Sequence, residues 1–434
     1  METKQPILFE YYPNLKEKVP YISLLTNLPT PIERLTELEK NFDLKDGAIY
    51  IKRDDKNHHI YGGNKLRKFE FIFGDAIREK KKGIVTMGGI GTNHGVASAI
   101  VCSMLEPPLK CEIFLFPQPL TWHVQRSLLL FDHFGAKLHL GGDDESIFRE
   151  FIDWQEKNPD YYLMFPGGSP IMGMGNSLGT LGFVNALFEL KAQIDKRIVP
   201  EPDAIFIPGA STGSAAGLVV GCKLLGLKTK VHIVAVYGEI SANPLAAKKN
   251  ANLAIKYLRE CDNSLPKIKV AYDDFVFIKG YLGSDYGIKT IQGQNAVDEI
   301  YEKEGRKRGF MLETTYTGKT LAAMFDWLKD KNNKSKNVLF WNTYNSNDLD
   351  NYLKETKFDY KKLPKEFHQF YKKLFQCWQI TNCPIKIRES CPAYLNHEYR
   401  FWKVATCKLD SQKIFKAKEE LTQAIELEET ELQY

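Results

Sequence analysis

Apolar and polar positions follow a repeating order through the middle of this chain. Short apolar runs rich in β-branched residues, such as GIVTMG (83–88) and DAIFIPG (203–209), are each followed by a stretch in which apolar residues recur at helical spacing. Apolar runs of this length alternating with helices are typical of parallel strands joined by right-handed crossovers. The pattern therefore predicts an α/β fold built on parallel twisted sheets.

The alternation covers most of the chain and ends near residue 346. Two later segments, 309–330 and 337–346, continue the order of apolar run, loop and helix. Open α/β sheets bind ligands at the carboxyl ends of their strands, so the loops there, rich in Gly, Ser, Thr and Asn, are where chemistry is expected. The earlier strand runs are 83–88, 111–117, 136–142, 203–209 and 230–238, and the helices that follow them are 91–105, 121–135, 144–157, 211–226 and 243–260.

The last part of the chain has a different pattern. Residues 346–434 are rich in Lys, Phe, Tyr and Trp, show no alternation of strand and helix runs, and end in the acidic segment KAKEELTQAIELEETELQY. We interpret them as a mainly helical C-terminal extension. Its aromatic side chains are expected to pack on the body of the protein or on a second subunit.

Composition excludes several classes of protein. The chain of 434 residues is 43% hydrophobic, enough for a sizeable core, and its net charge of +5 is spread over mixed signs instead of forming a basic patch for nucleic acid. No apolar run is long enough to span a membrane, and the segment METKQPILFEYYPNL lacks the features of a secretory signal. We therefore expect a cytoplasmic protein without nucleic-acid or membrane partners, with two or three domains or one large unit and a satellite.

The cysteines favour free thiols over a metal site. The chain has eight of them with no CxxC pair, and their spacing fits no common zinc pattern. We therefore predict no metal ligands.

The segment PGASTGSAAGLVVG (208–221) follows one predicted strand and opens a predicted helix. Its small residues allow backbone N–H groups to approach an anion, and the helix N-terminus adds partial positive charge. Ser211, Thr212 and Ser214 can add hydroxyl donors. The segment has neither the GK[ST] of a P-loop nor a GxGxxG motif. It fits a phosphate-binding loop, or simply a tight turn between a strand and a helix.

A second glycine loop, GGIGTNHG (88–95), also lies between a predicted strand and a predicted helix. Thr92 and Asn93 are good helix caps. Together with His94 they place a hydroxyl, an amide and an imidazole in one loop. Either these groups act on a ligand, or they only cap the helix and His94 lies at its exposed start.

The segment GGNKLRKFEF (62–71) opens another predicted helix. Gly62, Gly63 and Asn64 suit a turn and a helix cap, and the phenylalanines supply an apolar face. Lys65 lies inside this turn. It is either an ordinary solvated lysine or a nucleophile held by a rigid turn.

The order of these motifs resembles one known family. GGNKLRKFEF, GGIGTNHG, PGASTG, DYG, YTGK and WNT follow one another as in the D-cysteine desulfhydrase / 1-aminocyclopropane-1-carboxylate (ACC) deaminase group of pyridoxal-phosphate (PLP) enzymes. The resemblance runs from about residue 15 to residue 345, and GGNKLRKFEF is its most specific part.

The resemblance implies the fold and the assembly. It implies the two-domain tryptophan synthase β-like fold, PLP fold type II, and a homodimer. The larger domain would comprise residues 1–65 and 178–345, the smaller domain residues 66–177, and the extension residues 346–434.

The resemblance also implies the site residues. Lys65 is similar to the lysine that forms the Schiff base with PLP, and Asn93 to the asparagine beside the 3-oxygen of the ring. The implied catalytic residues are Lys65, Thr92, Tyr286 and Tyr316, and the implied cofactor-binding residues are Lys65, Asn93, Ala210, Ser211, Thr212, Gly213, Ser214, Thr317 and Thr343.

Several positions depart from the family pattern. Thr92 replaces the usual Ser, and Ala210 and Thr212 stand where glycines are usual. The usual HTGG is NTYN here, so that Tyr344 and Asn345 replace two glycines near the cofactor and could reshape the substrate pocket.

Two positions bear on the reaction. ACC deaminases carry Glu after the tyrosine, as YEGK, where this chain has Thr317; further on they tend to have Leu, where desulfhydrases and this chain (Thr343) have Thr. The resemblance thus favours a PLP-dependent α,β-elimination on a small amino acid, with a D-cysteine-like substrate yielding pyruvate, ammonia and sulfide. The alternatives are ACC deamination, dehydration or racemisation of a D-hydroxy amino acid, and a catalytically inactive scaffold protein.

Overall fold

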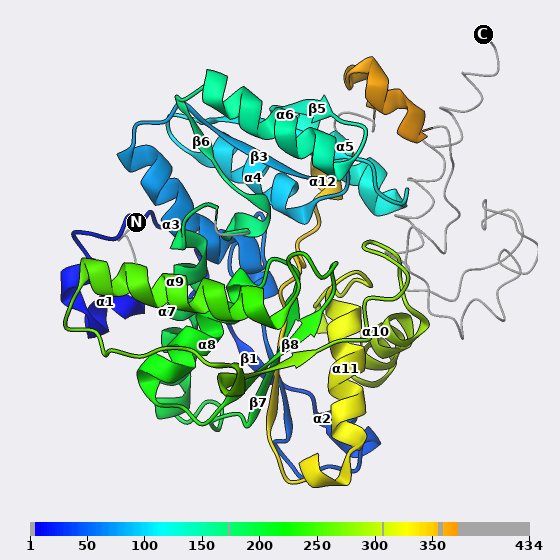
Figure 1. Cartoon of the computed structure of the whole chain (residues 1–434). Helices are drawn as coiled ribbons and strands as arrows, with labels where there is room; N and C mark the ends of the chain where they lie inside the picture. The colour runs from blue at the N-terminus through cyan, green and yellow to red at the C-terminus, as the bar shows by residue number, and fades with distance from the viewer. Residues whose placement is uncertain (1–4, 172–173, 306–307, 355–358, 372–434) are drawn as a thin grey trace, which may run out of the picture. The chain divides into compact units, whose positions relative to one another are not determined.

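The structure, a computed structural model, describes residues 5–171, 174–305, 308–354 and 359–371 (Figure 1). These residues form two compact units, and each is described by itself. The first consists of the described parts of Met1–Met87 and Asp153–Asn347, and the second of those of Gly88–Ile152 and Asp348–Tyr434.

The regular elements alternate along the chain as the sequence pattern predicts. The strands are β1 (Ile32–Arg34), β2 (Ile49–Lys52), β3 (Gly83–Gly89), β4 (Lys110–Phe116), β5 (Ala136–Leu140), β6 (Tyr161–Leu163), β7 (Ala204–Gly209), β8 (Lys230–Ala235), β9 (Phe275–Ile278) and β10 (Val338–Trp341). The helices are α1 (Ile7–Tyr11), α2 (Thr36–Asn41), α3 (Asn64–Arg78), α4 (Asn93–Met104), α5 (Trp122–His133), α6 (Asp144–Lys157), α7 (Leu178–Asp195), α8 (Gly213–Leu225), α9 (Pro244–Cys261), α10 (Ile291–Lys303), α11 (Thr317–Lys329) and α12 (Asp350–Lys354). Short 3-10 helices include η2 (Asp54–Lys56), η3 (Pro166–Gly168), η7 (Tyr360–Lys362) and η8 (Lys365–Tyr371).

The first unit is built on a six-stranded sheet in the order β1-β2-β10-β7-β8-β9. The pairs from β2 to β9 are parallel, whereas β1 pairs antiparallel with β2 at the edge. In Figure 1, α7, α8 and α9 lie on one side of this sheet and α2, α10 and α11 on the other. One apolar core joins α2, α10 and α11 to the strands, with Phe206, Val338 and Phe340 at its centre. The predicted α/β fold with parallel sheets is confirmed.

The other sheet has four strands in the order β5-β4-β3-β6. β4 pairs with β5 and β3 with β6, both in parallel. Within the second unit, the described start of the C-terminal extension packs on α5. The hydroxyl of Tyr371 donates to the carbonyl O of Gln125 at 2.7 Å, Arg126 pairs with Asp350, and the ring of Tyr352 contacts that of Phe134. The predicted contact of extension aromatics with the protein body holds here, whereas residues 372–434 lie outside the described residues.

The apolar run at the start of segment 309–330 is not a strand. Residues 309–313 are irregular, and their backbone donors find side chains: the N–H of Met311 donates to Ser346 Oγ at 2.7 Å and that of Leu312 to Tyr301 Oη at 2.9 Å. The run is apolar because Phe310 and Leu312 are buried in the core of the first unit.

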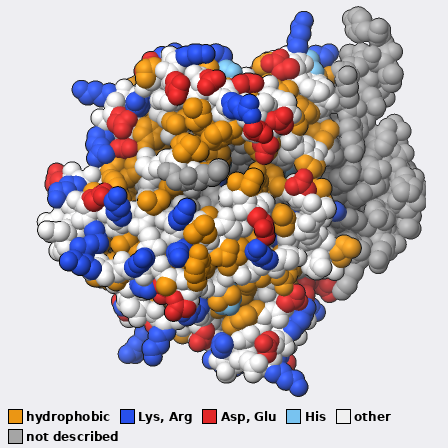
Figure 2. Space-filling view, in the orientation of Figure 1, with side chains coloured by type: hydrophobic (Ala, Val, Ile, Leu, Met, Phe, Trp, Pro, Cys, Tyr) orange, Lys and Arg blue, Asp and Glu red, His pale blue; other side chains and the backbone are white. Residues whose placement is uncertain are grey.

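Charged side chains of both signs are interspersed over the face that Figure 2 shows. Of the helices that the structure describes, none is long and apolar enough to cross a membrane. Within the described ranges there is also no group of three or more His, Cys, Asp or Glu residues that could hold a metal ion. Cys102, Cys111, Cys222 and Cys261 are free thiols, and the other four cysteines lie outside the described residues.

Candidate active site

Lys65 lies in the first turn of α3, directly after a turn that glycine makes possible. Gly63 has a φ angle of 104°, a conformation that L-residues rarely adopt. A Cβ atom on Gly62 would lie 1.9 Å from the carbonyl O of Asp55, so only glycine fits. The rigid turn predicted from GGNK is therefore present.

Asn64 links this turn to two other predicted site segments. Its backbone N–H donates to the carbonyl O of Thr343 at 3.1 Å, directly after β10. Its side-chain Nδ2 lies 3.3 Å from Ser214 Oγ, in the first turn of α8. Three predicted segments, those of Lys65, Ser214 and Thr343, thus meet within the first unit.

The amine of Lys65 has lost most of its hydration. The side chain keeps some exposed surface, but burial lowers the pKa of Lys65 to about 8. In the part of the chain that the structure describes, no carboxylate offsets this shift. A lysine with such a pKa supplies neutral, nucleophilic amine at mildly alkaline pH. An ordinary solvated lysine would not, so the environment favours the nucleophile interpretation.

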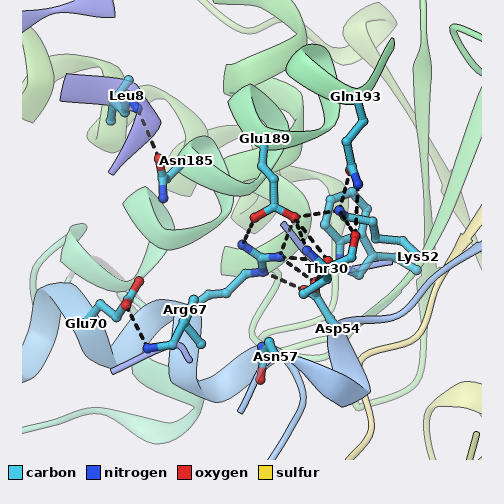
Figure 3. A network of polar contacts seen from close by, with 12 residues as sticks. Leu8, Thr30, Lys52, Asp54, Asn57, Arg67, Glu70, Asn185, Glu189 and Gln193 are labelled. Carbon is cyan, nitrogen blue, oxygen red and sulfur yellow. Dashed lines mark hydrogen bonds and ion pairs between the residues drawn. The ribbon is translucent and has the colours of Figure 1, made fainter. Parts of the chain in front are cut away.

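Arg67 belongs to a buried ion network (Figure 3). Its guanidinium donates to both carboxylate oxygens of Asp54 at 2.6 and 2.7 Å, and to those of Glu189 at 3.1 and 3.2 Å. Lys52 Nζ donates to the same Glu189 at 2.6 Å and to Gln193 Oε1 at 2.6 Å. The network joins β2, α3 and α7 inside the first unit.

The charges of this network are matched. Burial alone would lower the pKa of Arg67, but the negative charges of Asp54 and Glu189 outweigh it and raise the pKa above its ordinary value. Burial alone would raise the pKa of Glu189, but Arg67 and Lys52 lower it to about 2. Arg67 is therefore a permanently charged structural residue that fixes α3.

Lys68 is a further buried cation of α3, and it faces a loop instead of carboxylates. Its Nζ donates to the carbonyl O of Gly167 and to Ser169 Oγ, both at 2.6 Å. Burial, and then the charge of Lys65, hold its pKa well below the ordinary value. A Cβ atom on Gly213 would lie 3.1 Å from this Nζ, so the ammonium stands at the N-terminus of α8.

The loop 210–214 turns sharply into α8. Thr212 has a φ angle of 61°, the left-handed conformation that favours glycine. Asn250 from α9 holds it, since its Nδ2 donates to loop backbone at 3.0 Å and to Thr212 Oγ1 at 3.1 Å. A Cβ atom on Gly213 would lie 1.9 Å from Ser169 Oγ. Thr212 thus adopts a left-handed conformation that glycine would adopt more readily.

Tyr286 and Tyr316 lie against each other, as the pairing implied by the resemblance requires. Their hydroxyl oxygens are 2.5 Å apart, and the ring of Tyr237 packs edge-on against Tyr286 with centroids 4.8 Å apart. Burial raises the pKa of Tyr286 to about 12 and holds that of Tyr316 well above its ordinary value. Both hydroxyls therefore keep their protons at neutral pH.

Thr317 begins α11, and its hydroxyl is engaged with Glu313. Thr317 Oγ1 lies 2.8 Å from the carbonyl O of Glu313 and 3.1 Å from Oε1. The carboxylate of Glu313 also accepts from the backbone N–H groups of Thr315, Tyr316 and Thr317 at 2.6, 2.9 and 2.8 Å. This carboxylate complements the positive end of the helix and holds Tyr316 at its start.

Lys319, the lysine of the YTGK motif, anchors the tyrosine loop. It is fully buried, and its Nζ donates to the carbonyl O of Leu282 at 2.6 Å. Because Leu282 precedes Tyr286 by four residues, this bond fixes the start of the loop that carries Tyr286. The motif lysine therefore acts on loop structure.

Thr92 and Asn93 belong to the second unit. Thr92 caps α4, since its side chain accepts from the N–H of Gly95 at 3.4 Å. His94 is buried, so the interpretation that it lies at an exposed helix start is wrong. The roles of Thr92 and Asn93 toward a ligand stay predictions from the resemblance.

The comparison with protein families explains this combination of residues. The family described as pyridoxal-phosphate dependent enzyme matches residues 24–343. The chain belongs to this family. It is therefore an enzyme, and its cofactor is pyridoxal phosphate.

Solved structures show the same fold. An ACC deaminase homologue superposes with a TM-score of 0.63 at 24% identity, covering 79% of this chain and 95% of that one. Threonine deaminase isoform 2 from Solanum lycopersicum superposes with a TM-score of 0.51 at 17% identity, covering 82% of this chain and 96% of that one. A hydrogen sulfide-producing enzyme from Fusobacterium nucleatum superposes with a TM-score of 0.50 at 16% identity, covering 73% of this chain and 93% of that one. The PLP fold type II architecture is thus confirmed.

The donors around loop 210–214 suit the phosphate of the cofactor. A phosphate offers only acceptor oxygens and negative charge. The first turn of α8 presents N–H groups with the positive end of the helix, Ser211 and Ser214 offer hydroxyls, and Lys68 adds an ammonium beside Gly213. The chemistry of this donor set therefore fits PLP.

Sequence reasoning left three contributors without a role. Lys68 was visible only as a basic residue of the segment GGNKLRKFEF, and its partners Gly167 and Ser169 lie about a hundred residues away. Asn250 and Tyr237 follow β8 and carry no motif at all. Only the tertiary structure brings these side chains to the site.

Proposed function

We propose that this enzyme catalyses the α,β-elimination of a small amino acid, with D-cysteine as the substrate. D-cysteine and water give pyruvate, ammonia and hydrogen sulfide, so the Cα–H and Cβ–S bonds break and no oxidant is needed. The observation that carries this proposal is Thr317, a buried hydroxyl where ACC deaminases carry a carboxylate. Thr343, at the position where desulfhydrases have Thr, supports the same choice.

Lys65 is the residue that would hold PLP and act as the base. When bound, PLP supplies the electron sink for charge that develops at the substrate α-carbon. The lowered pKa of Lys65, about 8, favours an amine that can take the α-proton near neutral pH. The glycine turn before Lys65 supports this role because a fixed backbone keeps the amine aligned with that carbon.

The tyrosine pair is proposed to supply the proton to the leaving group. Tyr286 and Tyr316 share one hydroxyl proton in their 2.5 Å contact, which leaves a second hydroxyl proton for the departing sulfur. Neither hydroxyl is ionised at the pH of the reaction, so the pair holds a proton that can be donated. Neutralising the leaving hydrosulfide makes cleavage of the Cβ–S bond easier.

Loop 210–214 and Lys68 are proposed to bind the phosphate of PLP. Thr317 and Thr343 are proposed to lie near the ring nitrogen. A hydroxyl there stabilises a carbanion less than a carboxylate would, which suits loss of a good leaving group better than the opening of an unactivated cyclopropane. ACC deamination is therefore the second candidate, and the fold shared with the ACC deaminase homologue does not decide between them.

A substrate screen tests the proposal. The purified enzyme with PLP is assayed for keto-acid release from a panel of D- and L-amino acids and ACC, with the K65A variant as the control. We expect D-cysteine to give the highest kcat/KM and sulfide to appear in equal amount to pyruvate. Turnover of ACC without pyruvate release from D-cysteine would contradict it, and turnover of D-serine alone would point to dehydration.

The assembly and location are further parts of this proposal. The resemblance supports a homodimer, and light scattering should then give about twice the chain mass of 49.7 kDa. We also infer a cytoplasmic location from the resemblance and from the composition of the chain.

A further inference from the structure

Asparagine side chains hold the loop that precedes Lys65. Asn57 Nδ2 donates to the carbonyl O of Gly63 at 2.8 Å. Asn347 Nδ2 donates to the carbonyl O of His58 at 2.8 Å. Asn345 makes the third contact, in which its Oδ1 accepts from the backbone N–H of Gly62 at 2.7 Å.

The backbone N–H groups around the glycine turn have different kinds of acceptors. The N–H of Gly63 donates to the carbonyl O of Asp54 at 2.8 Å, and that of Asn64 to the carbonyl O of Thr343 at 3.1 Å. Both of these acceptors belong to the main chain. The acceptor for Gly62 is the side chain of Asn345, so this contact can be removed without replacing any main-chain group.

The turn has no room to rearrange around a lost contact. Gly62 lies against the backbone of Asp55, and a Cβ atom on Gly63 would lie 2.6 Å from the carbonyl O of Thr343. The N–H of Gly62 is buried with its residue, and a buried donor without an acceptor is unfavourable because it has lost its hydration. The turn therefore depends on the oxygen that Asn345 supplies.

The amide of Asn345 is itself oriented by its neighbours. Its Oδ1 accepts a second N–H, that of Asn347 at 3.1 Å, and its Nδ2 donates to the carbonyl O of Asn347 at 2.9 Å. Because two N–H groups point at one atom of the amide, that atom must be the oxygen. Asn345 is also buried, so its side chain has one defined position.

We propose that Asn345 is a positioning residue for Lys65. Its Oδ1 fixes Gly62 three residues before Lys65, and Thr343, two residues before Asn345, fixes Asn64 through its carbonyl O. The segment after β10 thereby sets where α3 begins and how the Lys65 amine is aimed. Glycine at position 345, usual in the family that this chain resembles, has no side chain to do this. The inference rests on the proposed role of Lys65.

Loss of the contact between Asn345 and Gly62 should therefore change the reaction rate more than the affinity for the substrate. A displacement of a reacting group by about 1 Å costs on the order of a hundredfold in rate. We therefore expect N345A to lower kcat by about ten- to a hundredfold while KM for the amino acid changes less than about threefold. The pH midpoint of the cofactor absorbance band should move by about half a unit, because the amine meets a changed environment.

Two matched variants isolate the effect. N345D keeps an oxygen for the N–H groups of Gly62 and Asn347 but sets its second oxygen against the carbonyl O of Asn347, so it should recover only part of the rate that N345A loses. S346A removes the neighbouring side chain, whose Oγ accepts from Met311 N–H and does not touch the turn, and should leave kcat and the band unchanged. Hydrogen exchange of the peptide spanning residues 58–64 gives a readout without turnover and should speed up in N345A only.

The outcomes separate this inference from the proposed function. K65A that keeps the cofactor band would overturn the role of Lys65. K65A that loses the band, together with N345A that keeps wild-type kcat, band midpoint and exchange rate, would overturn only the positioning role. N345A that loses stability while its folded fraction keeps wild-type kcat would also overturn it, because the contact would then be merely structural.

Discussion

Helix α3 carries buried cations of two kinds within one turn. Arg67 is surrounded by the carboxylates of Asp54 and Glu189, which raise its pKa above the ordinary value. Lys65, whose side chain keeps some exposed surface, and the buried Lys68 have no such partners among the described residues, and loss of hydration lowers the pKa of both. The same helix and a similar loss of hydration therefore give opposite electrostatic results.

The difference teaches how to separate structural from chemical cations. A buried charge with matched counter-charges stays charged and ties elements together, and removal of one partner leaves the others uncompensated. A buried amine without a counter-charge is held ready to lose its proton, or to take up an anion from outside. Burial alone does not distinguish the two roles, but the partners do.

The largest expected effect is on turnover. K65A should lower kcat by about 10⁴-fold or more and abolish the cofactor absorbance band, because it removes both the attachment point and the base. Its free energy of unfolding should fall by less than about 1 kcal/mol, since no ion pair is lost. Steady-state kinetics and urea unfolding measure the two quantities. A K65A protein that is active, or that unfolds like an Arg67 variant, would break the comparison.

The second effect is on stability. R67M should lower the free energy of unfolding by about 3–5 kcal/mol, because Asp54 would be left as a buried charge without its cation and Glu189 would keep only Lys52. R78M is the matched control on the same helix, since Arg78 is 54% exposed in its pair with Asp75 and should cost less than about 1 kcal/mol. Urea denaturation of both variants gives the difference. Equal losses would show that the network is not special.

The third effect is on cofactor affinity. K68M should weaken PLP binding about ten- to a hundredfold, the range expected for loss of a charged hydrogen bond to phosphate. K81M is the control, since Lys81 lies in the same stretch of sequence and its Nζ reaches the carbonyl O of Pro159 and the partly exposed carboxylate of Glu79, not the loop 210–214. A PLP titration followed by absorbance measures the ratio. If K68M bound PLP with wild-type affinity, Lys68 would have a structural role like that of Arg67.

The smallest effect is a shift in a titration midpoint. A lysine reacts with aldehydes as the neutral amine, whose fraction rises with pH. Reductive methylation of Lys65 in the PLP-free protein should therefore rise through a midpoint at about pH 8 and then level off. Peptides with exposed lysines should keep gaining reactivity up to pH values near 10.4. Peptide mass spectrometry measures methylation at each lysine. If methylation of Lys65 rose with pH as it does at the exposed lysines, the lowered pKa of Lys65, which sets it apart from Arg67, would be contradicted.

Much of the fold could be predicted because buried parallel strands are continuous apolar runs. This signal identified the strands from β3 to β5, and also β7, β8 and β10. It missed β1 and β2, whose segments IER and IYIK are short and carry charge, and the three-residue strand β6. It also missed β9 (FVFI), although this strand is as long and as apolar as β10. The run at 309–312 is apolar because its side chains are buried in the core, although its backbone does not pair in a sheet.

The site was predictable only where a motif is local. The turn before Lys65 and the loop 210–214 depend on nearby glycines and small residues, so they can be read from short segments. The partners of Arg67 lie 13 and 122 residues away, and no spacing rule connects them. The contact of Asn345 with Gly62 spans 283 residues, and the sequence presented Asn345 only as bulk that replaces a glycine.

The contacts of Asp350, Tyr352 and Tyr371 with α5 bear on synthesis of the chain. The family match ends at residue 343, yet Leu349, Leu353 and Phe367 are buried, in segments that belong to the same unit as α5. Because domains fold during translation from the N-terminus onward, α5 leaves the ribosome more than two hundred residues before these partners. Until Asp350, Tyr352 and Tyr371 have emerged, α5 therefore lacks the ion pair, the ring contact and the hydrogen bond that they make with it in the finished second unit.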